Sequence, residues 1–267
     1  ERNIYYIIRD AMVGVEVSEP FNIATKKEVL DRLSDTKLKY IDKSQSSYSE
    51  TKFSITSLML LDYHQKPGFS NYYDKSLIFP GMLYSLQDKV PLFSYLKNAN
   101  SAFFWAAGKN FVCVPTNSWT CINSSQGFLP NNLFNFYLTS PFPKISNHLF
   151  KNIYGQDTIG PFIEYIDNND MPKTPFFAYI HHNIPHRPFL VNSECGPANY
   201  YNKNFEGYKA SYQCALKTIE IFMEKINNED PEAIVVFQGD HGLMEPLDLK
   251  LAEKEKYLFA GNIFNAI

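Results

Sequence analysis

The sequence predicts an α/β domain in which helices cover both faces of a central, mostly parallel sheet. Apolar, strand-like runs alternate along the chain with segments of helical periodicity, as in layered α/β folds. The run at 233–237 is apolar throughout, which is typical of a strand buried on both faces. Because 267 residues with 45% hydrophobic content can form one core, residues 1–267 are expected to form a single domain.

The first half of the chain predicts two strands and two helices. Residues 3–8 form an apolar run that predicts the first strand. The apolar run at 55–61 predicts a helix, and Pro91 suits the first position of a second helix over 91–97. Residues 102–105 predict a short strand.

The second half begins with a segment, 113–150, whose many Asn, Ser and Pro residues predict a loop. Residues 176–180 predict another strand. From Tyr212 to Ile226, apolar residues recur at three- and four-residue spacing, which predicts an amphipathic helix. This helix leads into the strand at 233–237.

Charge argues against nucleic acid as a partner, and hydropathy argues against a membrane-spanning helix within these residues. The net charge is -3 without a long basic run, so electrostatics give no basis for nucleic-acid binding. The longest apolar runs are about six residues, well short of the roughly 20 that span a bilayer. Because a strand opens the chain almost directly, we expect the sequence to be part of a longer protein.

The four cysteines are Cys113, Cys121, Cys195 and Cys214. None forms a Cys-x-x-Cys pair, so the sequence supports neither a zinc ribbon nor a thioredoxin-type motif. Two disulfides in an oxidising compartment and four reduced core cysteines remain equally good interpretations.

Polar residues follow three of the predicted strands, where ligands bind in open parallel sheets. Asp10 follows the first strand, His181 and His182 follow the strand at 176–180, and the Asp240-His241-Gly242 sequence follows the last. A carboxylate and an imidazole at one strand end can both turn toward one metal ion. The alternative is structural, because Asp240 and Asp10 could each simply cap a following helix.

Two further segments carry candidate chemistry. Hydroxyl residues from Tyr48 to Ser57 precede and enter a helix start, where a metal-bound hydroxyl could become a nucleophile and helix amides could bind an anion. An ordinary Ser/Thr cap is the alternative. Within seven residues the chain has His181, His182, His186 and Arg187, and core histidines rarely cluster in this way. Imidazole and guanidinium groups suit hydrogen bonding to phosphate or sulfate oxygens.

In order along the chain, these motifs resemble the membrane-anchored, sulfatase-like branch of the alkaline phosphatase superfamily. This branch includes the lipoteichoic acid synthases and phosphoethanolamine transferases. The matching pieces are a first strand ending in Asp10, the Tyr-x-x-Thr stretch that begins at Tyr48, the histidine stretch at 181–188, and Gln238-Gly239-Asp240-His241-Gly242. Residues 262–266 resemble the family's next strand. The resemblance implies a three-layer, alkaline-phosphatase-like sandwich.

The resemblance assigns a role to each matched residue. Thr51 would be the nucleophile, and Asp10, Thr51, Asp240 and His241 would be the metal ligands. His181, His186 and Arg187 would bind the substrate anion or assist the leaving group. The implied cofactor is one divalent ion, zinc or manganese. Residues 243–256 contain no histidine, which argues against a second ion.

The implied activity is transfer of a phospho-headgroup, of phosphoethanolamine or phosphoglycerol type, from a lipid to a cell-envelope acceptor through a covalent threonine intermediate. A phosphodiesterase or atypical sulfatase of the same fold is one alternative, and a catalytically inactive binding domain is another. A formylglycine sulfatase is not expected, because the chain lacks Cys/Ser-x-Pro-x-Arg. The resemblance also implies a monomer outside the cytoplasmic membrane, tethered by an N-terminal anchor.

Overall fold

The computed structural model describes residues 2–63, 78–86, 89–108, 113, 119–123, 157–196, 198, 205–243 and 252–267. Its described part contains one six-stranded sheet of order β3-β2-β4-β1-β5-β6. The strands are β1 (Ile4–Arg9), β2 (Ala102–Ala107), β3 (Trp119–Asn123), β4 (Phe176–His182), β5 (Ile234–Gln238) and β6 (Asn265–Ala266). All neighbouring pairs are parallel except β5 and β6, which confirms the predicted mostly parallel sheet.

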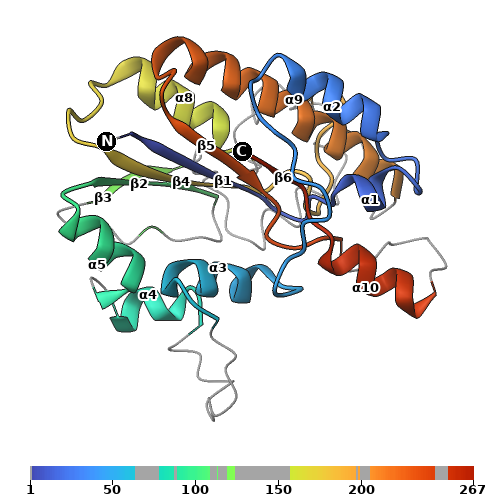
Figure 1. The fold of residues 1–267 in the computed structure, drawn as a ribbon, viewed down its shortest axis with the longest axis horizontal. Helices are drawn as coiled ribbons and strands as arrows, with labels where there is room; N and C mark the ends of the chain where they lie inside the picture. The colour runs from blue at the N-terminus through green and yellow to red at the C-terminus, as the bar shows by residue number, and fades with distance from the viewer. Residues whose placement is uncertain are drawn as a thin grey trace, which may run out of the picture.

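Helices cover both faces of this sheet, as expected for three layers (Figure 1). One layer holds α3 (Thr51–Leu60), α4 (Gly81–Leu86) and α5 (Pro91–Asn98). The other holds α1 (Val15–Ser18), α2 (Lys26–Ser34), α8 (Ile159–Asn168) and α9 (Phe205–Glu229). A last helix, α10 (Glu253–Gly261), lies beside the turn that follows β5, at the right of Figure 1. No helix in the described ranges is both long and apolar enough to cross a membrane.

Alternate residues of β1, β2 and β4 supply two separate cores. Phe104, Ala178 and Ile180 face the layer that contains α9, whereas Phe103 and Tyr179 face α3 and α5. This is the two-residue period of a strand buried on both faces. The helix predicted at 91–97 is confirmed with Pro91 as its first residue, and the helix predicted at 55–61 begins earlier, at Thr51.

Two predictions of local structure are wrong. The segment 113–150 was expected to be a loop, but β3 lies within it and is held by its pairing with β2. Such a short strand depends on tertiary pairing, and its sequence signal is weak beside the surrounding Asn and Ser. The remainder of that segment, apart from Cys113, lies outside the described residues.

The strand β5 is buried on one face rather than on both. Val235 and Phe237 are buried beneath α9, whereas Ile234 and Val236 are only partly buried. The apolar run at 233–237 therefore predicted the strand correctly but overstated the burial of the face on the α3–α5 side.

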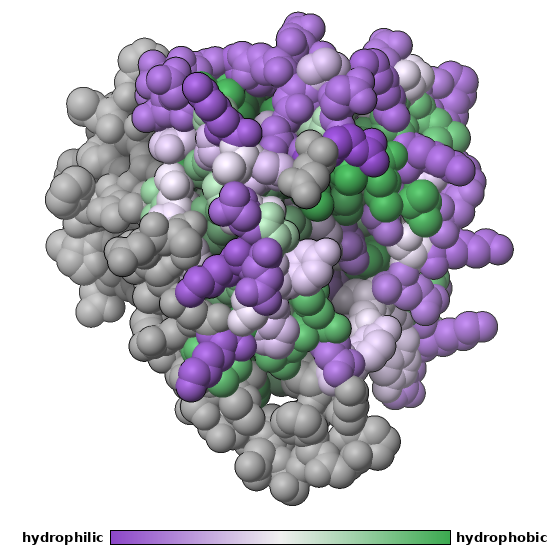
Figure 2. Space-filling model, turned by 60° about the vertical axis from the view of Figure 1, so that its left-hand side comes forward, coloured by the Kyte–Doolittle hydropathy of each residue, from purple (hydrophilic) through white to green (hydrophobic). Residues whose placement is uncertain are grey.

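In the view of Figure 2, hydrophilic and apolar side chains are mixed over the described part of the surface.

Both cysteine pairs are disulfides, which resolves the two interpretations left open by the sequence. Cys113 bonds to Cys121 in β3, and Cys195 bonds to Cys214. The second bond ties the segment after β4 to the middle of α9.

Candidate active site

Parallel pairing brings the polar strand ends to one edge of the sheet. The last residue of β1 lies in register with the last residue of β4, and the Asp10 amide donates to the His182 carbonyl at 3.1 Å. On the other side of β1, Ile8 lies in register with Gln238 of β5. Asp10 and Asp240 therefore emerge beside each other, although 230 positions separate them in the sequence numbering.

Three buried side chains converge at this edge. Asp10, Asp240 and His241 each offer one ligand atom, and these atoms all lie within 4.8 Å of one another. The His241 Nε2 lies 3.5 Å from the Asp10 Oδ1 and 3.7 Å from the Asp240 Oδ2. Both carboxylate oxygens are buried and have no hydrogen-bond partner in the part of the chain that the structure describes. Two orphaned oxygens next to an imidazole nitrogen are the donor set of a divalent-metal site.

Hydrogen bonds fix Asp240 in this orientation. Its Oδ1 accepts from the amides of Ala11 at 3.2 Å and His241 at 2.9 Å, so only Oδ2 points to the candidate metal position. Its backbone carbonyl accepts from the hydroxyls of Ser46 at 2.5 Å and Ser54 at 2.7 Å. The Ser46 and Ser54 contacts were not predicted from the sequence, because they join a loop and a helix to a distant strand end.

The tautomer of His241 also suits a ligand. Its Nδ1 donates to the Gly242 carbonyl at 2.6 Å, which leaves a lone pair on Nε2. A glycine is required at position 242, because a Cβ there would lie 1.8 Å from the Phe259 carbonyl oxygen. The close approach of α10 to this turn therefore explains Gly242.

Thr51 completes the group as the first residue of α3. Its Oγ1 lies 3.0 Å from the His241 Nε2. The Glu50 side chain makes no capping hydrogen bond to the helix that follows it. The hydroxyl therefore sits at the positive end of a helix and beside the buried carboxylates, as expected from the sequence.

The pKa values of the two carboxyls, Asp10 and Asp240, shift in opposite directions. Burial alone would raise the pKa of Asp10, but the neighbouring His186, His181 and His241 lower it to about 2. Burial and the nearby Asp10 charge raise the pKa of Asp240. Burial opposes protonation of His241, yet Asp240 and Asp10 raise its pKa overall. Close, like-charged carboxylates of this kind are balanced most simply by a cation between them.

His181 lies beneath the site rather than in it. The side chain has no exposed surface, its Nδ1 is 2.9 Å from the Tyr179 hydroxyl, and its Nε2 is 3.3 Å from the Asp10 Oδ2. The structure thus brings His181 to a metal-ligand candidate and not to open space, because both ring nitrogens are engaged within the protein. Tyr179 was missed from the sequence, where it reads as an ordinary aromatic core residue.

A cleft of about 240 Å³ opens directly over Thr51 and His241. His186 and Arg187, for which the sequence predicts binding of the substrate anion, line it together with Lys52, which the sequence reasoning missed. The His186 ring centre lies 6.3 Å from that of His241. Lys52 pairs with Glu50 at 2.7 Å on the cleft wall. Imidazole, guanidinium and ammonium groups around a hydroxyl favour an anionic substrate.

The amino-acid sequence matches a known protein family. A protein-family model described as Sulfatase matches residues 39–260. The chain belongs to the sulfatase family. This sulfatase-family domain is a metal-dependent enzyme acting on phosphate or sulfate esters, within the alkaline phosphatase superfamily. No curated protein sequence matches the chain significantly.

Solved structures share the fold at low sequence identity. The zinc complex of the C-terminal periplasmic domain of EptC from Escherichia coli is 12% identical, with a TM-score of 0.58 over 99% of this chain and 72% of that one. The lipooligosaccharide phosphoethanolamine transferase A from Neisseria meningitidis is 12% identical, with a TM-score of 0.56 over 100% and 47%. The phosphonate monoester hydrolase of Agrobacterium radiobacter is 11% identical, with a TM-score of 0.53 over 100% and 68%.

Proposed function

We propose that this sulfatase-family domain transfers a phospho-headgroup, of phosphoethanolamine or phosphoglycerol type, from a lipid to a hydroxyl acceptor. The supporting observation is the Thr51 hydroxyl, placed at a helix N-terminus 3.0 Å from the His241 Nε2 and under a cationic cleft. A threonine at that point is suited to attack an ester phosphorus and to carry the headgroup between two substrates. Residues 1–267 would form the single catalytic domain.

Four side chains would hold the metal ion. Asp10 and Asp240 would contribute the orphaned oxygens, His241 its Nε2 and Thr51 its hydroxyl. When bound, a divalent ion such as zinc or manganese lowers the pKa of a hydroxyl ligand and so makes Thr51 nucleophilic. His181, held by Tyr179, would position Asp10 from below.

The cleft residues would handle the phosphate oxygens and the protons. Arg187 and Lys52 would bind the phosphate oxygens. Thr51 would enter the reaction as the alkoxide, its proton having passed to solvent. As its oxygen forms the bond to phosphorus, the bond to the lipid alcohol breaks, and His186 donates a proton to the leaving oxygen. In the second half, the acceptor oxygen bonds to phosphorus, its proton passes to His186, and Thr51 leaves as the alkoxide.

A second cleft, of about 180 Å³, favours an alcohol acceptor over water. Tyr6, Gln238 and Asp240 line it, together with residues of α3. Its polar lining consists largely of neutral hydroxyl and amide groups, including Ser46, Ser54 and Gln238. Such groups suit a hydroxylated acceptor. Hydrolysis of a phosphodiester or sulfate ester by the same residues is the second candidate, because water could also enter here.

We further propose that the domain works as a monomer outside the cytoplasmic membrane, attached through an anchor N-terminal to the residues described. Two disulfides suit an oxidising compartment, and two matched EptC structures are named as C-terminal periplasmic domains.

Peptide mass spectrometry tests the proposal. The zinc-loaded or manganese-loaded protein is incubated with phosphatidylethanolamine or phosphatidylglycerol and digested. A headgroup adduct on the peptide that contains Thr51 supports the transferase, and its mass identifies the group. Ester turnover without any threonine adduct would favour direct hydrolysis, and metal binding without turnover would favour a binding domain.

A further inference from the structure

Arg9, at the end of β1, is buried without a partner on the face of the sheet opposite the cleft. Its side chain has no exposed surface, and its Nε, Nη1 and Nη2 make no hydrogen bond to any residue the structure describes. In β1 it lies on the same face as Tyr5 and Ile7, which belong to the core beneath α9. An unpaired, buried guanidinium destabilises the folded protein.

A second orphaned donor lies beside it. His182 is in register with Arg9 on the neighbouring strand and has no exposed surface. Its Nδ1 accepts from the Thr158 amide at 3.3 Å, so the ring proton is on Nε2. That Nε2 is buried and has no hydrogen-bond partner among the described residues. The two side chains therefore present N–H donors and no acceptor.

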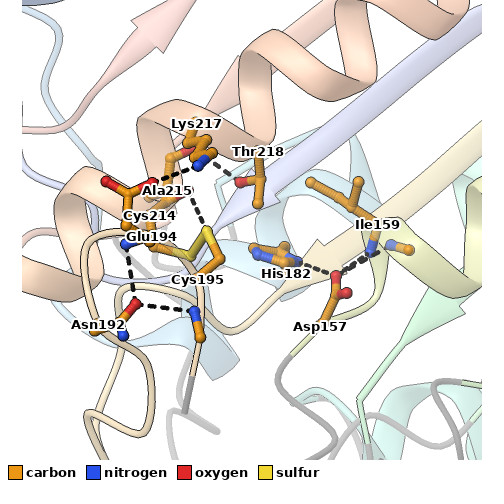
Figure 3. The surroundings of a disulfide bond; sticks show 12 residues. Asp157, Ile159, His182, Asn192, Glu194, Cys195, Cys214, Ala215, Lys217 and Thr218 are labelled. Atoms are coloured by element: carbon orange, nitrogen blue, oxygen red, sulfur yellow. Dashed lines mark hydrogen bonds and ion pairs between the residues drawn. A yellow bond between two sulfur atoms is a disulfide. The ribbon is translucent and has the colours of Figure 1, made fainter. Parts of the chain in front are cut away.

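Burial lowers the pKa of Arg9, and the nearby Asp157 carboxylate opposes this shift. Asp157 lies 3.6 Å from the His182 Nδ1, but its side chain is 56% exposed. Its Oδ1 already accepts the amides of Ile159 and Gly160 at the start of α8. Figure 3 shows His182 and Asp157 among the residues around the Cys195–Cys214 disulfide. The sequence stretches 108–156 and 197–204, which precede Asp157 and α9, contain no Asp or Glu.

We propose that Arg9 and His182 form a buried binding site for a small inorganic anion of the halide type, such as chloride. The anion accepts from the guanidinium and from the His182 Nε2–H, and it neutralises the buried charge. Complete burial of both side chains favours a monatomic ion over a bulkier oxyanion. The site is separate from the cleft over Thr51, because Arg9 and His182 face the α9 core.

The direct test is anomalous diffraction from crystals of the wild-type protein soaked in bromide. The proposal expects a bromide peak beside the Arg9 guanidinium. Bromide found solely at the Asp10–Asp240–His241 group, or a water or a protein carboxylate beside Arg9, overturns it. This measurement does not require catalysis, so its result can be separated from whether the proposed transferase activity is found.

Thermal unfolding at constant ionic strength supplies the second test. Replacing gluconate by chloride is expected to raise the wild-type Tm by about 2 °C or more, saturating with concentration. Arg9→Met keeps the length of the side chain and is expected to lose the chloride dependence while unfolding in gluconate at or above the wild-type Tm. The control is Arg32→Met on α2, whose arginine is partly exposed and paired with Glu220, and it should respond like the wild type. Equal chloride responses of Arg9→Met and the wild type would contradict the site.

Discussion

The hydroxyl oxygen of Thr51 lies 3.0 Å from the Nε2 of His241, although the two residues are 190 positions apart in the chain. The Nδ1 of His241 donates to a carbonyl, so its Nε2 is turned toward the hydroxyl. The helix start and the end of the last parallel strand thus meet at one point. This contact makes Thr51, among the hydroxyls of its segment, the candidate nucleophile.

Thr51→Ala is expected to lower kcat by roughly 10⁴-fold or more and to abolish the headgroup adduct, because the attacking oxygen is removed. Thr51→Ser keeps a hydroxyl and should retain measurable turnover and a serine adduct. Steady-state kinetics and peptide mass spectrometry measure both. The matched control is Thr218→Ala, whose hydroxyl bonds to a carbonyl of α9 away from the cleft. Wild-type kinetics for Thr51→Ala would refute the assignment.

Asp240→Asn should weaken zinc or manganese binding by at least about 100-fold, because it removes a charged ligand that two amides hold in place. Isothermal titration of the metal-free protein measures the affinity, and circular dichroism checks the fold. Asp35→Asn, an exposed position after α2, serves as the control. Equal affinities for Asp240→Asn and wild type would remove Asp240 from the metal centre.

Tyr179→Phe should weaken metal binding by roughly 10- to 100-fold without opening the cleft, since it deletes the partner that orients His181 against Asp10. A chelator competition experiment measures this change. Tyr95→Phe, at a tyrosine that is 66% exposed, controls for loss of a hydroxyl. If His181 instead bound substrate directly, Tyr179→Phe would raise KM and leave the metal affinity unchanged.

Replacing Cys195 and Cys214 by serine should lower the free energy of unfolding by about 3 kcal/mol, because the bond closes a 19-residue separation in the unfolded chain. Urea denaturation of the oxidised protein and the double variant measures the difference. The Cys113–Cys121 bond spans only eight positions, so its removal should cost less. An unchanged unfolding midpoint would mean that the Cys195–Cys214 bond does not form.

Stability should fall steeply above pH 10. Burial raises the pKa of Tyr208 and Tyr212, whose hydroxyls donate to the carbonyls of Ala11 and Val13. A tyrosine whose pKa is raised by folding makes its full contribution to the free energy of unfolding at any pH below its unfolded pKa, which is near 10. Above that pH, only the unfolded state ionises, so each such tyrosine costs about 1.4 kcal/mol per pH unit until the folded pKa is reached. Urea unfolding between pH 8 and 11.5 measures this loss, and Tyr208→Phe should reduce the slope. A slope unaffected by Tyr208→Phe would contradict the assignment.

The sequence alone determined the local chemistry of this protein. Alternating strands and helices predicted the layered sheet, and the strand-end rule predicted Asp10, Asp240 and His241 as candidate metal ligands, which the structure brings together. These signals are local, because strand periodicity and strand-terminal polar residues depend on neighbours within a few positions. The same reasoning erred at β3 and overstated the burial of β5, where pairing and coverage by distant segments decide the outcome.

Only the tertiary structure decided which side of the sheet each polar residue serves. His181 and His182 are adjacent in the sequence, yet the strand pleat sends one to Asp10 and the other to Arg9 and Thr158. It also paired the four cysteines and placed Tyr179 and Lys52 at the site. These relationships depend on register and packing between segments far apart in the chain, which no local pattern encodes.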